Sequence, residues 1–115
     1  MKYALMIYGT QAGYAAFSPE EFQTLVDRHD AWIARLRDSG ELVAAQGLEG
    51  EDQARSVRVR DGIPVVTDGP FVEAKEFLAS FYIVECSAGR AVELAAQLPE
   101  AEFSAVEVRP VYEGS

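Results

Sequence analysis

The chain contains a single histidine, His29, and its surroundings suggest proton-transfer chemistry. Apolar residues lie three, four or seven positions away, so His29 falls in the middle of the apolar stripe of a predicted helix. A desolvated imidazole needs a hydrogen-bond partner, and a neighbouring carboxylate would fix its tautomer and form an acid–base pair. The alternative is a structural histidine whose ring is satisfied by a backbone carbonyl. The apolar positions of the stripe are Phe22, Leu25, Val26, Trp32, Ile33 and Leu36.

Asp68 is the carboxylate that we expect to partner His29. It begins the segment Asp68-Gly69-Pro70-Phe71, and a rigid Gly-Pro turn could hold its side chain at the mouth of a pocket. There it would orient His29 or accept a substrate proton. The alternative is an aspartate that only forms the turn, with its side chain bonded to the following backbone amides.

Four further residues are candidates for binding a small-molecule substrate. Tyr8 and Tyr14 flank the first loop and could line a cleft, and Phe71 directly follows the Asp68 turn. Arg58 lies on the polar face of a predicted strand and could grip an anionic substrate. The alternative for Arg58, as for Arg60, is an arginine exposed on a sheet.

The remaining polar residues suggest neither a metal nor an organic cofactor. We read Glu73, Lys75 and Glu76 as solvated charges on a loop. One histidine and one cysteine, Cys86, do not supply the ligands of a tight zinc site, and one cysteine cannot form an internal disulfide. Nothing matches a phosphate-binding glycine loop or a dinucleotide fingerprint. We therefore expect no cofactor.

The elements that must position these residues follow from hydrophobic periodicity and turn signals. Ser18-Pro19-Glu20-Glu21 is a helix start with a capping box, and Gly40 is typical of a helix end. Asp61-Gly62 between two short alternating runs predicts a β-hairpin. The expected elements are a strand over 2–8, a loop over 9–17, a helix over 19–39, a strand over 41–48, a turn over 50–53, a hairpin around 61–62, a strand over 77–86 and a strand over 105–111. A further helix of about ten residues is expected after Ser87 and is closed by Pro99. Its inward-facing residues are expected to be Ala91, Val92, Ala95 and Leu98.

This order indicates an α+β fold, the ferredoxin-like βαββαβ arrangement with an extra central hairpin. Helices cover only one face of such a sheet, yet the predicted strand 77–86 is largely apolar on both faces. A strand that is apolar on both faces is usually buried on both. We therefore expect a homodimer in which two sheets meet face to face as a dimeric α+β barrel. The alternative is a monomer with loops folded over the sheet. The two faces are Phe77, Ala79, Phe81 and Ile83 on one side, and Leu78, Tyr82, Val84 and Cys86 on the other.

Length and charge limit the remaining possibilities. The 115 residues correspond to one domain, and ten basic against nineteen acidic residues give a net charge of −9. An acidic surface disfavours nucleic acid and anionic membranes as partners. No apolar run approaches the roughly 20 residues of a membrane span, and the N-terminus does not resemble a signal peptide. We expect a cytoplasmic protein.

The segment from Asp68 to Glu76, Asp-Gly-Pro-Phe-Val-Glu-Ala-Lys-Glu, resembles the DGPF group of the YCII-related domain family. The resemblance continues into the aromatic strand from Phe77 to Tyr82. The first eight residues, Met-Lys-Tyr-Ala-Leu-Met-Ile-Tyr, are also similar to that family, as is the helix around His29-Asp30-Ala31-Trp32. It covers essentially the whole chain, residues 1–115.

This resemblance implies a ferredoxin-like subunit that dimerises into an α+β barrel. It also implies a histidine–aspartate site in a cleft, with His29 matching the helical histidine and Asp68 the aspartate of the motif. The family includes a dehydrochlorinase of aromatic breakdown, which implies lyase-type chemistry on a small ring compound. Genes of the DGPF group often neighbour extracytoplasmic-function sigma factors, which implies a regulatory association as the alternative to catalysis.

Overall fold

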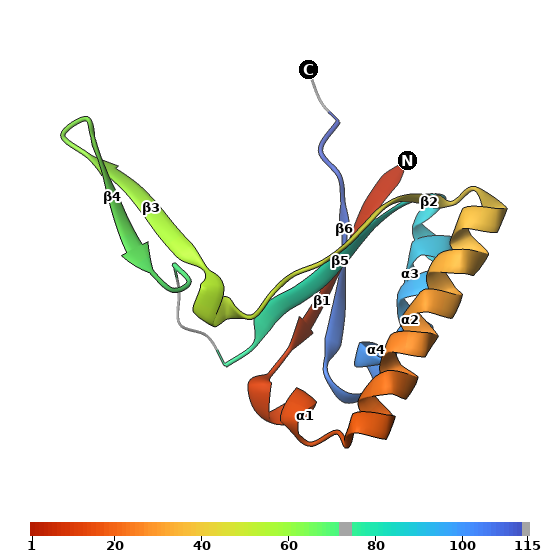
Figure 1. The fold of residues 1–115 in the computed structure, drawn as a ribbon. Coiled ribbons are helices and arrows are strands. Elements are labelled where there is room, and N and C mark those ends of the chain that lie inside the picture. The colour runs from red at the N-terminus through yellow and green to blue at the C-terminus, as the bar shows by residue number, and fades with distance from the viewer. Residues whose placement is uncertain (72–74, 114–115) are drawn as a thin grey trace.

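A computed structural model describes residues 1–71 and 75–113 as a mixed α+β domain (Figure 1). Its main sheet is antiparallel with the strand order β2-β5-β1-β6, the order of a ferredoxin-like fold. A second, two-stranded sheet is the hairpin β3–β4. The elements are β1 (Lys2–Gly9), α1 (Gln11–Ala15), α2 (Pro19–Ser39), β2 (Leu42–Gly47), the 3₁₀ turn η1 (Glu51–Gln53), β3 (Arg55–Arg60), β4 (Ile63–Asp68), β5 (Phe77–Glu85), α3 (Ala88–Ala96), α4 (Glu100–Phe103) and β6 (Ala105–Pro110).

The long helix α2 begins and ends where its capping signals predict. The Ser18 side chain accepts a hydrogen bond from the Glu21 amide, and the Glu21 carboxylate accepts one from the Ser18 amide. Gly40 ends the helix with a φ of 80°, a left-handed conformation that glycine adopts without strain. Within the described residues, no helix is long and apolar enough to cross a membrane.

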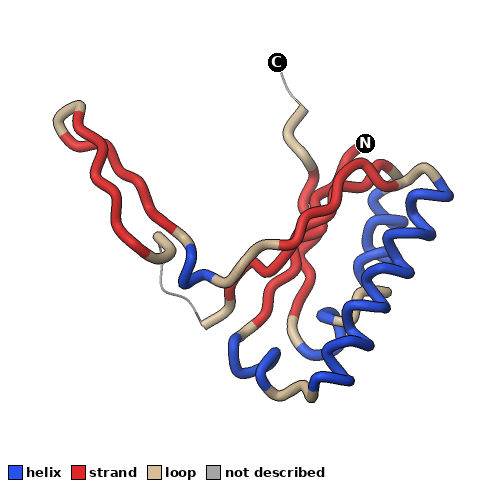
Figure 2. The backbone as a smooth tube through the Cα atoms, viewed as in Figure 1, coloured by secondary structure: helices blue, strands red, loops and turns tan. Residues whose placement is uncertain are grey.

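The hydrophobic core lies between one face of the main sheet and the helices α2 and α3, which cover that face (Figures 1 and 2). Trp32 is 1% exposed, packs against Tyr82 with ring centroids 4.5 Å apart, and donates a hydrogen bond from its indole nitrogen to the Leu94 carbonyl. The other core residues are Tyr3, Leu5, Ile7, Leu36, Val84, Ala91, Leu94, Ala95 and Leu98. Trp32 therefore ties both helices to the centre of the sheet.

Two expectations about local structure were wrong. Residues 11–15 form the short helix α1, where Thr10 caps the Gly13 amide, although two glycines suggested only a loop. The helix after Ser87 ends at Ala96, ahead of Pro99 as expected, and a further short helix, α4, follows Pro99. In α3, Leu94 is buried and Val92 is 59% exposed, so Val92 does not face inward.

A bulge in β5 changes the face on which Phe77 lies. Ile7 pairs with Ser80 but Tyr8 pairs with Leu78, so the alternation of side chains shifts by one residue. Phe77 consequently pairs with Gly9 and contacts Tyr14, with ring centroids 6.2 Å apart. The expectation that Phe77 shares a face with Phe81 was wrong, because strict alternation takes no account of a bulge.

The hairpin β3–β4 forms a sheet of its own instead of extending the main sheet. Its turn residues Asp61 and Gly62 have φ values of 52° and 77°, as a tight two-residue hairpin turn requires. In Figures 1 and 2 the hairpin projects away from the main sheet on the side opposite α2 and α3. The expected extra hairpin is therefore present, and it forms a separate two-stranded sheet that projects from the domain.

Candidate functional site

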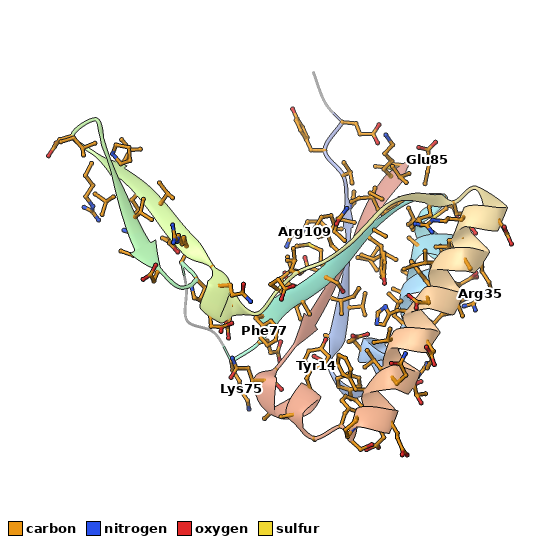
Figure 3. All side chains as sticks on the ribbon, viewed as in Figure 1. Tyr14, Arg35, Lys75, Phe77, Glu85 and Arg109 are labelled. Carbon is orange, nitrogen blue, oxygen red and sulfur yellow. The ribbon has the colours of Figure 1, made fainter. Side chains whose placement is uncertain are left out.

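A cavity of about 610 Å³ opens between α2, the sheet strands β2 and β5, and the short helices α1 and α4. Apolar side chains make most of its wall, and Tyr82, Glu100 and Tyr14 form a hydrogen-bonded group with His29. Figure 3 labels Tyr14 and Phe77, which lie close together at this end of the sheet. The lining residues are Tyr14, Phe22, Leu25, Val26, His29, Asp30, Ile33, Ala45, Gln46, Gly47, Leu48, Gly50, Phe77, Ala79, Ser80, Tyr82 and Glu100.

His29 makes two short side-chain contacts within the cavity wall. Its Nε2 lies 2.7 Å from Glu100 Oε1, and its Nδ1 lies 2.7 Å from the Tyr82 hydroxyl. The other Glu100 oxygen, Oε2, accepts a hydrogen bond of 3.1 Å from the Tyr14 hydroxyl. The side chains of His29 and Glu100 are only 12% and 3% exposed. The result is a connected chain of hydrogen bonds from Tyr82 through His29 and Glu100 to Tyr14.

The chemistry of these partners fixes where the protons lie. An ionised carboxylate only accepts hydrogen bonds, so Nε2 of His29 carries a proton and donates it to Glu100. In the neutral imidazole Nδ1 is then the acceptor, and the Tyr82 hydroxyl donates to it. The hydroxyls of Tyr82 and Tyr14, both residues that line the cavity, are thus the two ends of the chain.

Burial and hydrogen bonding act in opposite directions on Glu100. Burial alone would raise the pKa of the Glu100 carboxyl, but the hydrogen bond and the charge of His29 outweigh it and hold that pKa below its usual range. Burial, followed by the charge of Glu100, raises the pKa of both Tyr14 and Tyr82. Both phenols are therefore protonated donors at neutral pH, and Glu100 is an ionised acceptor.

Helix α4 holds Glu100 in place although it is only four residues long. The Ser104 amide donates to the Glu100 carbonyl at 2.8 Å. Arg28 on α2 makes two hydrogen bonds of 3.0 Å to Glu102, which lies two residues after Glu100 on α4. Adjacent residues of α2, Arg28 and His29, thus attach α4 to the long helix at two points.

The close approach of Tyr14 to the sheet depends on Gly9. A Cβ atom at position 9 would lie 2.3 Å from Tyr14 Cε2, a distance that real atoms do not adopt. The absence of a side chain at the end of β1 lets the Tyr14 ring pack against the backbone. From there its hydroxyl reaches Glu100.

The structure brings together only some of the residues expected in the site. His29 and Tyr14 line the cavity, but Tyr8 and Phe71 do not, and neither does Arg58, whose guanidinium lies 4.7 Å from the centre of the Phe71 ring. Asp68 ends β4 with its side chain 96% exposed and 3.8 Å from Arg55 Nε. Both ring nitrogens of His29 contact other residues, and Asp68 is not among them.

The turn after Asp68 is closed by the backbone of the hairpin. The Gly69 amide donates to the Ala54 carbonyl at 2.7 Å, and the Ser56 hydroxyl donates to the Gly69 carbonyl at 2.8 Å. Gly69 has a φ of 97°, which favours glycine. The segment therefore forms a turn, but backbone groups close it, and the Gly69 amide bonds to the Ala54 carbonyl and not to the Asp68 side chain as the turn-forming interpretation expected. The charged loop residue Glu73 lies outside the described residues, whereas Lys75 and Glu76 are exposed.

Sequence reasoning missed Glu100 and Tyr82 as parts of the site. Glu100 is 71 positions from His29 and is one of nineteen acidic residues in the chain. Apart from its position directly after Pro99, nothing in the sequence distinguishes Glu100 from the other acidic residues. Tyr82 was placed with Val84 on one largely apolar face of its strand and was not considered as a site residue. Within residues 1–71 and 75–113, no three His, Cys, Asp or Glu side chains are grouped so as to hold a metal ion.

The fold and the cavity define an α+β domain of the ferredoxin-like type with a histidine-containing pocket beside its sheet. The model of the YCII-related domain matches residues 1–115, and the chain belongs to that family. An uncharacterised protein of Rhizobium meliloti (strain 1021) is 32% identical over 114 residues, which cover 96% of this chain and 92% of that protein.

Proposed function

We propose that the chain is a small-molecule acid–base module in which Tyr82, His29 and Glu100 exchange a proton with a ligand in the cavity. The observation that supports this most strongly is the 2.7 Å contact between His29 Nε2 and a buried carboxylate at the wall of a 610 Å³ cavity. This proposal keeps His29 as the acid–base group of the site and assigns to Glu100 the orienting role first expected of Asp68. No cofactor is required.

The proton route follows from the hydrogen-bond directions. A ligand O–H or an acidic C–H group would give its proton to the Tyr82 oxygen while the Tyr82 proton passes to His29 Nδ1. Glu100 would stabilise the imidazolium that forms, in the way that a buried aspartate supports the histidine of a serine hydrolase. Reversal of the same steps would return the proton to a leaving group, which is the chemistry of a lyase.

The wall of the cavity favours an uncharged ligand. It is mostly apolar, its charged members are Asp30 and Glu100, and among the described lining residues none is a lysine or arginine. An anion would therefore meet carboxylates without a permanent cation to balance its charge. We propose a small, neutral ring compound, in place of the anionic substrate that Arg58 suggested.

Replacing Tyr82 by phenylalanine is expected to abolish proton exchange but leave the fold almost intact. The assay would follow loss of the α-proton signals of cyclohexanone in D₂O by NMR, as a probe for proton transfer from carbon. Acid–base catalysis of this kind contributes about 10²–10⁴-fold to a rate, so the variant should fall toward the buffer rate. Its stability should change by about 1 kcal/mol, the contribution of one hydrogen bond.

Tyr112→Phe is the matched control, because Tyr112 is 87% exposed and does not line the cavity. It should retain the parent rate. A parent protein that does not accelerate exchange, or a Tyr82→Phe variant that keeps the full rate, would contradict the proposed route. Ring ¹⁵N shifts of His29 provide a second test, because the geometry requires a proton on Nε2 and none on Nδ1 of the neutral ring.

A second candidate is a ligand-binding module without turnover. The observation in its favour is that both ring nitrogens of His29 already have partners within the chain, as a structural histidine would. The cyclohexanone assay separates the two candidates, because a binding module would perturb the His29 signals on ligand addition without exchanging protons. The association with a sigma factor and the role of Asp68 stay predictions, as does a cytoplasmic location.

A homodimer is part of the proposal. The face of the main sheet that α2 and α3 leave open carries partly buried apolar residues, and two such faces could cover each other as in a dimeric α+β barrel. From the register of β1 with β5, these residues are Ala4, Met6, Tyr8, Leu78, Phe81 and Ile83.

A further inference from the structure

We propose that Ser80 is a specificity-determining residue of the His29 cavity, where its hydroxyl donates a hydrogen bond to a second oxygen atom of the ligand. The ligand is then a neutral ring compound that carries a hydrogen-bond acceptor on the side of the ring away from its reacting group. The inference rests on the proposed function and narrows its class of ligand. Tyr82 exchanges the proton, and Ser80 binds the far side of the ring.

Ser80 lies on the face of β5 that borders the cavity. It pairs with Ile7 of β1 and with Gly47 of β2. Tyr82 follows two residues later, so both side chains project from the same face of the strand, and both residues line the cavity. The Cα atoms of two such residues are about 7 Å apart. Ser80 and Tyr82 can therefore contact opposite sides of one six-membered ring.

The hydroxyl of Ser80 is open to a ligand. The four polar side chains of the hydrogen-bonded group around His29 satisfy one another. Ser80 is partly buried, but its hydroxyl has no hydrogen-bond partner among the described residues. In the same part of the chain every buried polar side-chain atom has a partner, so the Ser80 oxygen is accessible from the cavity. A serine hydroxyl carries a proton that it can donate to an oxygen of the ligand.

The other polar residues of the wall do not offer the same donor. Asp30 is exposed, and an ionised carboxylate only accepts hydrogen bonds. Gln46 pairs with Phe81, so its side chain projects from the opposite face of the sheet. Ser80 is therefore the hydroxyl that can distinguish a ligand with a second acceptor from one without it.

Gly47 leaves open space beside Ser80. The two residues pair directly between β2 and β5, and a Cβ atom added at Gly47 would meet nothing within 4 Å. Ala45, two residues earlier on the same face of β2, also carries a small side chain and lines the cavity. The ring of a ligand can therefore lie over this part of the sheet, where the Ser80 hydroxyl reaches its edge. A hydroxyl in a mostly apolar wall favours ligands that accept its hydrogen bond.

Tetrahydropyran-4-one and cyclohexanone are the matched probes for this contact. They have nearly the same size and shape, but the first has an ether oxygen opposite its carbonyl where the second has a methylene group. NMR titration of the full chain would give the dissociation constant of each probe. Ser80→Ala should raise the constant for tetrahydropyran-4-one about fivefold, the effect of losing one neutral hydrogen bond. The constant for cyclohexanone should stay within about twofold, because it has no acceptor at that position.

Two further variants control the comparison. Ser39→Ala removes a hydroxyl that is exposed at the end of α2 and does not line the cavity, so both constants should be unchanged. Gly47→Val should raise the constants of both probes, because it fills the space beside Ser80 without removing the donor. Valine is well tolerated in a strand, so the fold should be retained.

The outcomes separate this contact from the acid–base function. Equal effects of Ser80→Ala on both probes, or a parent protein that does not bind tetrahydropyran-4-one, would overturn the role of Ser80, and the exchange assay with Tyr82→Phe would still judge the proton route. A parent that binds the two probes with the expected dependence on Ser80, but exchanges no protons, would support the contact and overturn the acid–base function.

Discussion

A chain with alanine in place of His29 is expected to lose about 3–5 kcal/mol of unfolding free energy at pH 7. The reason is Glu100, whose side chain is 3% exposed and would lose its charged partner, keeping the Tyr14 hydroxyl and a backbone amide as donors. Removing one partner of a buried pair leaves a charge that is neither solvated nor neutralised. Denaturant unfolding followed by circular dichroism would measure the change. The same variant should lose the proton exchange assigned to the site.

The neighbouring Arg28→Ala variant is the control for this loss. Arg28 also pairs with a glutamate of α4, but its side chain is 42% exposed and that of Glu102 is 61% exposed. Exposed pairs contribute about 0–1 kcal/mol, so this variant should be only slightly destabilised. Equal effects of the two substitutions would show that burial of the His29–Glu100 pair has no energetic weight.

Acidity should reduce the difference between the parent and His29→Ala. In the parent the pKa of Glu100 lies below the usual 4.5, so its stabilising contribution is complete above that value and is lost as the pH falls through the lower, folded-state pKa. Without His29, burial is the dominant influence and raises the pKa of Glu100, so the carboxyl takes up a proton at a higher pH. Unfolding curves between pH 3 and pH 7 would reveal whether the two stabilities converge.

Trp32→Ala is expected to destabilise the fold by about 3–5 kcal/mol, as truncation of large buried aromatic residues does. The substitution would empty the space between α2, α3 and the sheet, and would leave the Leu94 carbonyl without its indole donor. It would also remove the ring that packs on Tyr82 at 4.5 Å, so the tyrosine hydroxyl would no longer be held against His29. Circular dichroism, which does not depend on Trp32 fluorescence, would follow unfolding.

Phe22→Ala separates this packing effect from the presence of an aromatic ring on α2. Phe22 lines the cavity on the same helix but is 47% exposed, so its truncation should cost about 1 kcal/mol or less. A Trp32→Ala protein that is as stable as Phe22→Ala would contradict the role of Trp32 as the link between the two helices and the sheet.

Local signals in the sequence were sufficient to predict the main elements. Ser18 and Gly40 set the ends of α2, and Asp61-Gly62 set the hairpin turn, because these effects act over a few residues. The order of the elements then limited the sheet to few topologies. Phe22 was expected in the core but is exposed at the cavity, because periodicity identifies an apolar face without telling whether that face is filled or hollow.

The partner of His29 could not be predicted in the same way. The pairing joins α2 to a four-residue helix, and a helix so short leaves almost no periodic pattern. The choice of Asp68 followed a motif whose glycine is equally explained by the turn at the end of the hairpin. A β-bulge likewise leaves no reliable mark in the sequence, which is why Phe77 changed face.

The contact between Gly9 and Tyr14 couples the shape of the cavity wall to one of the hydrogen bonds of Glu100. Any larger side chain at position 9 must displace the Tyr14 ring, which changes the wall of the pocket and disturbs a hydrogen bond of Glu100 at the same time. A relative of this chain that bound a bulkier ligand could not simply gain room there. It would also have to compensate the carboxylate, so shape and acidity at this site can change only together.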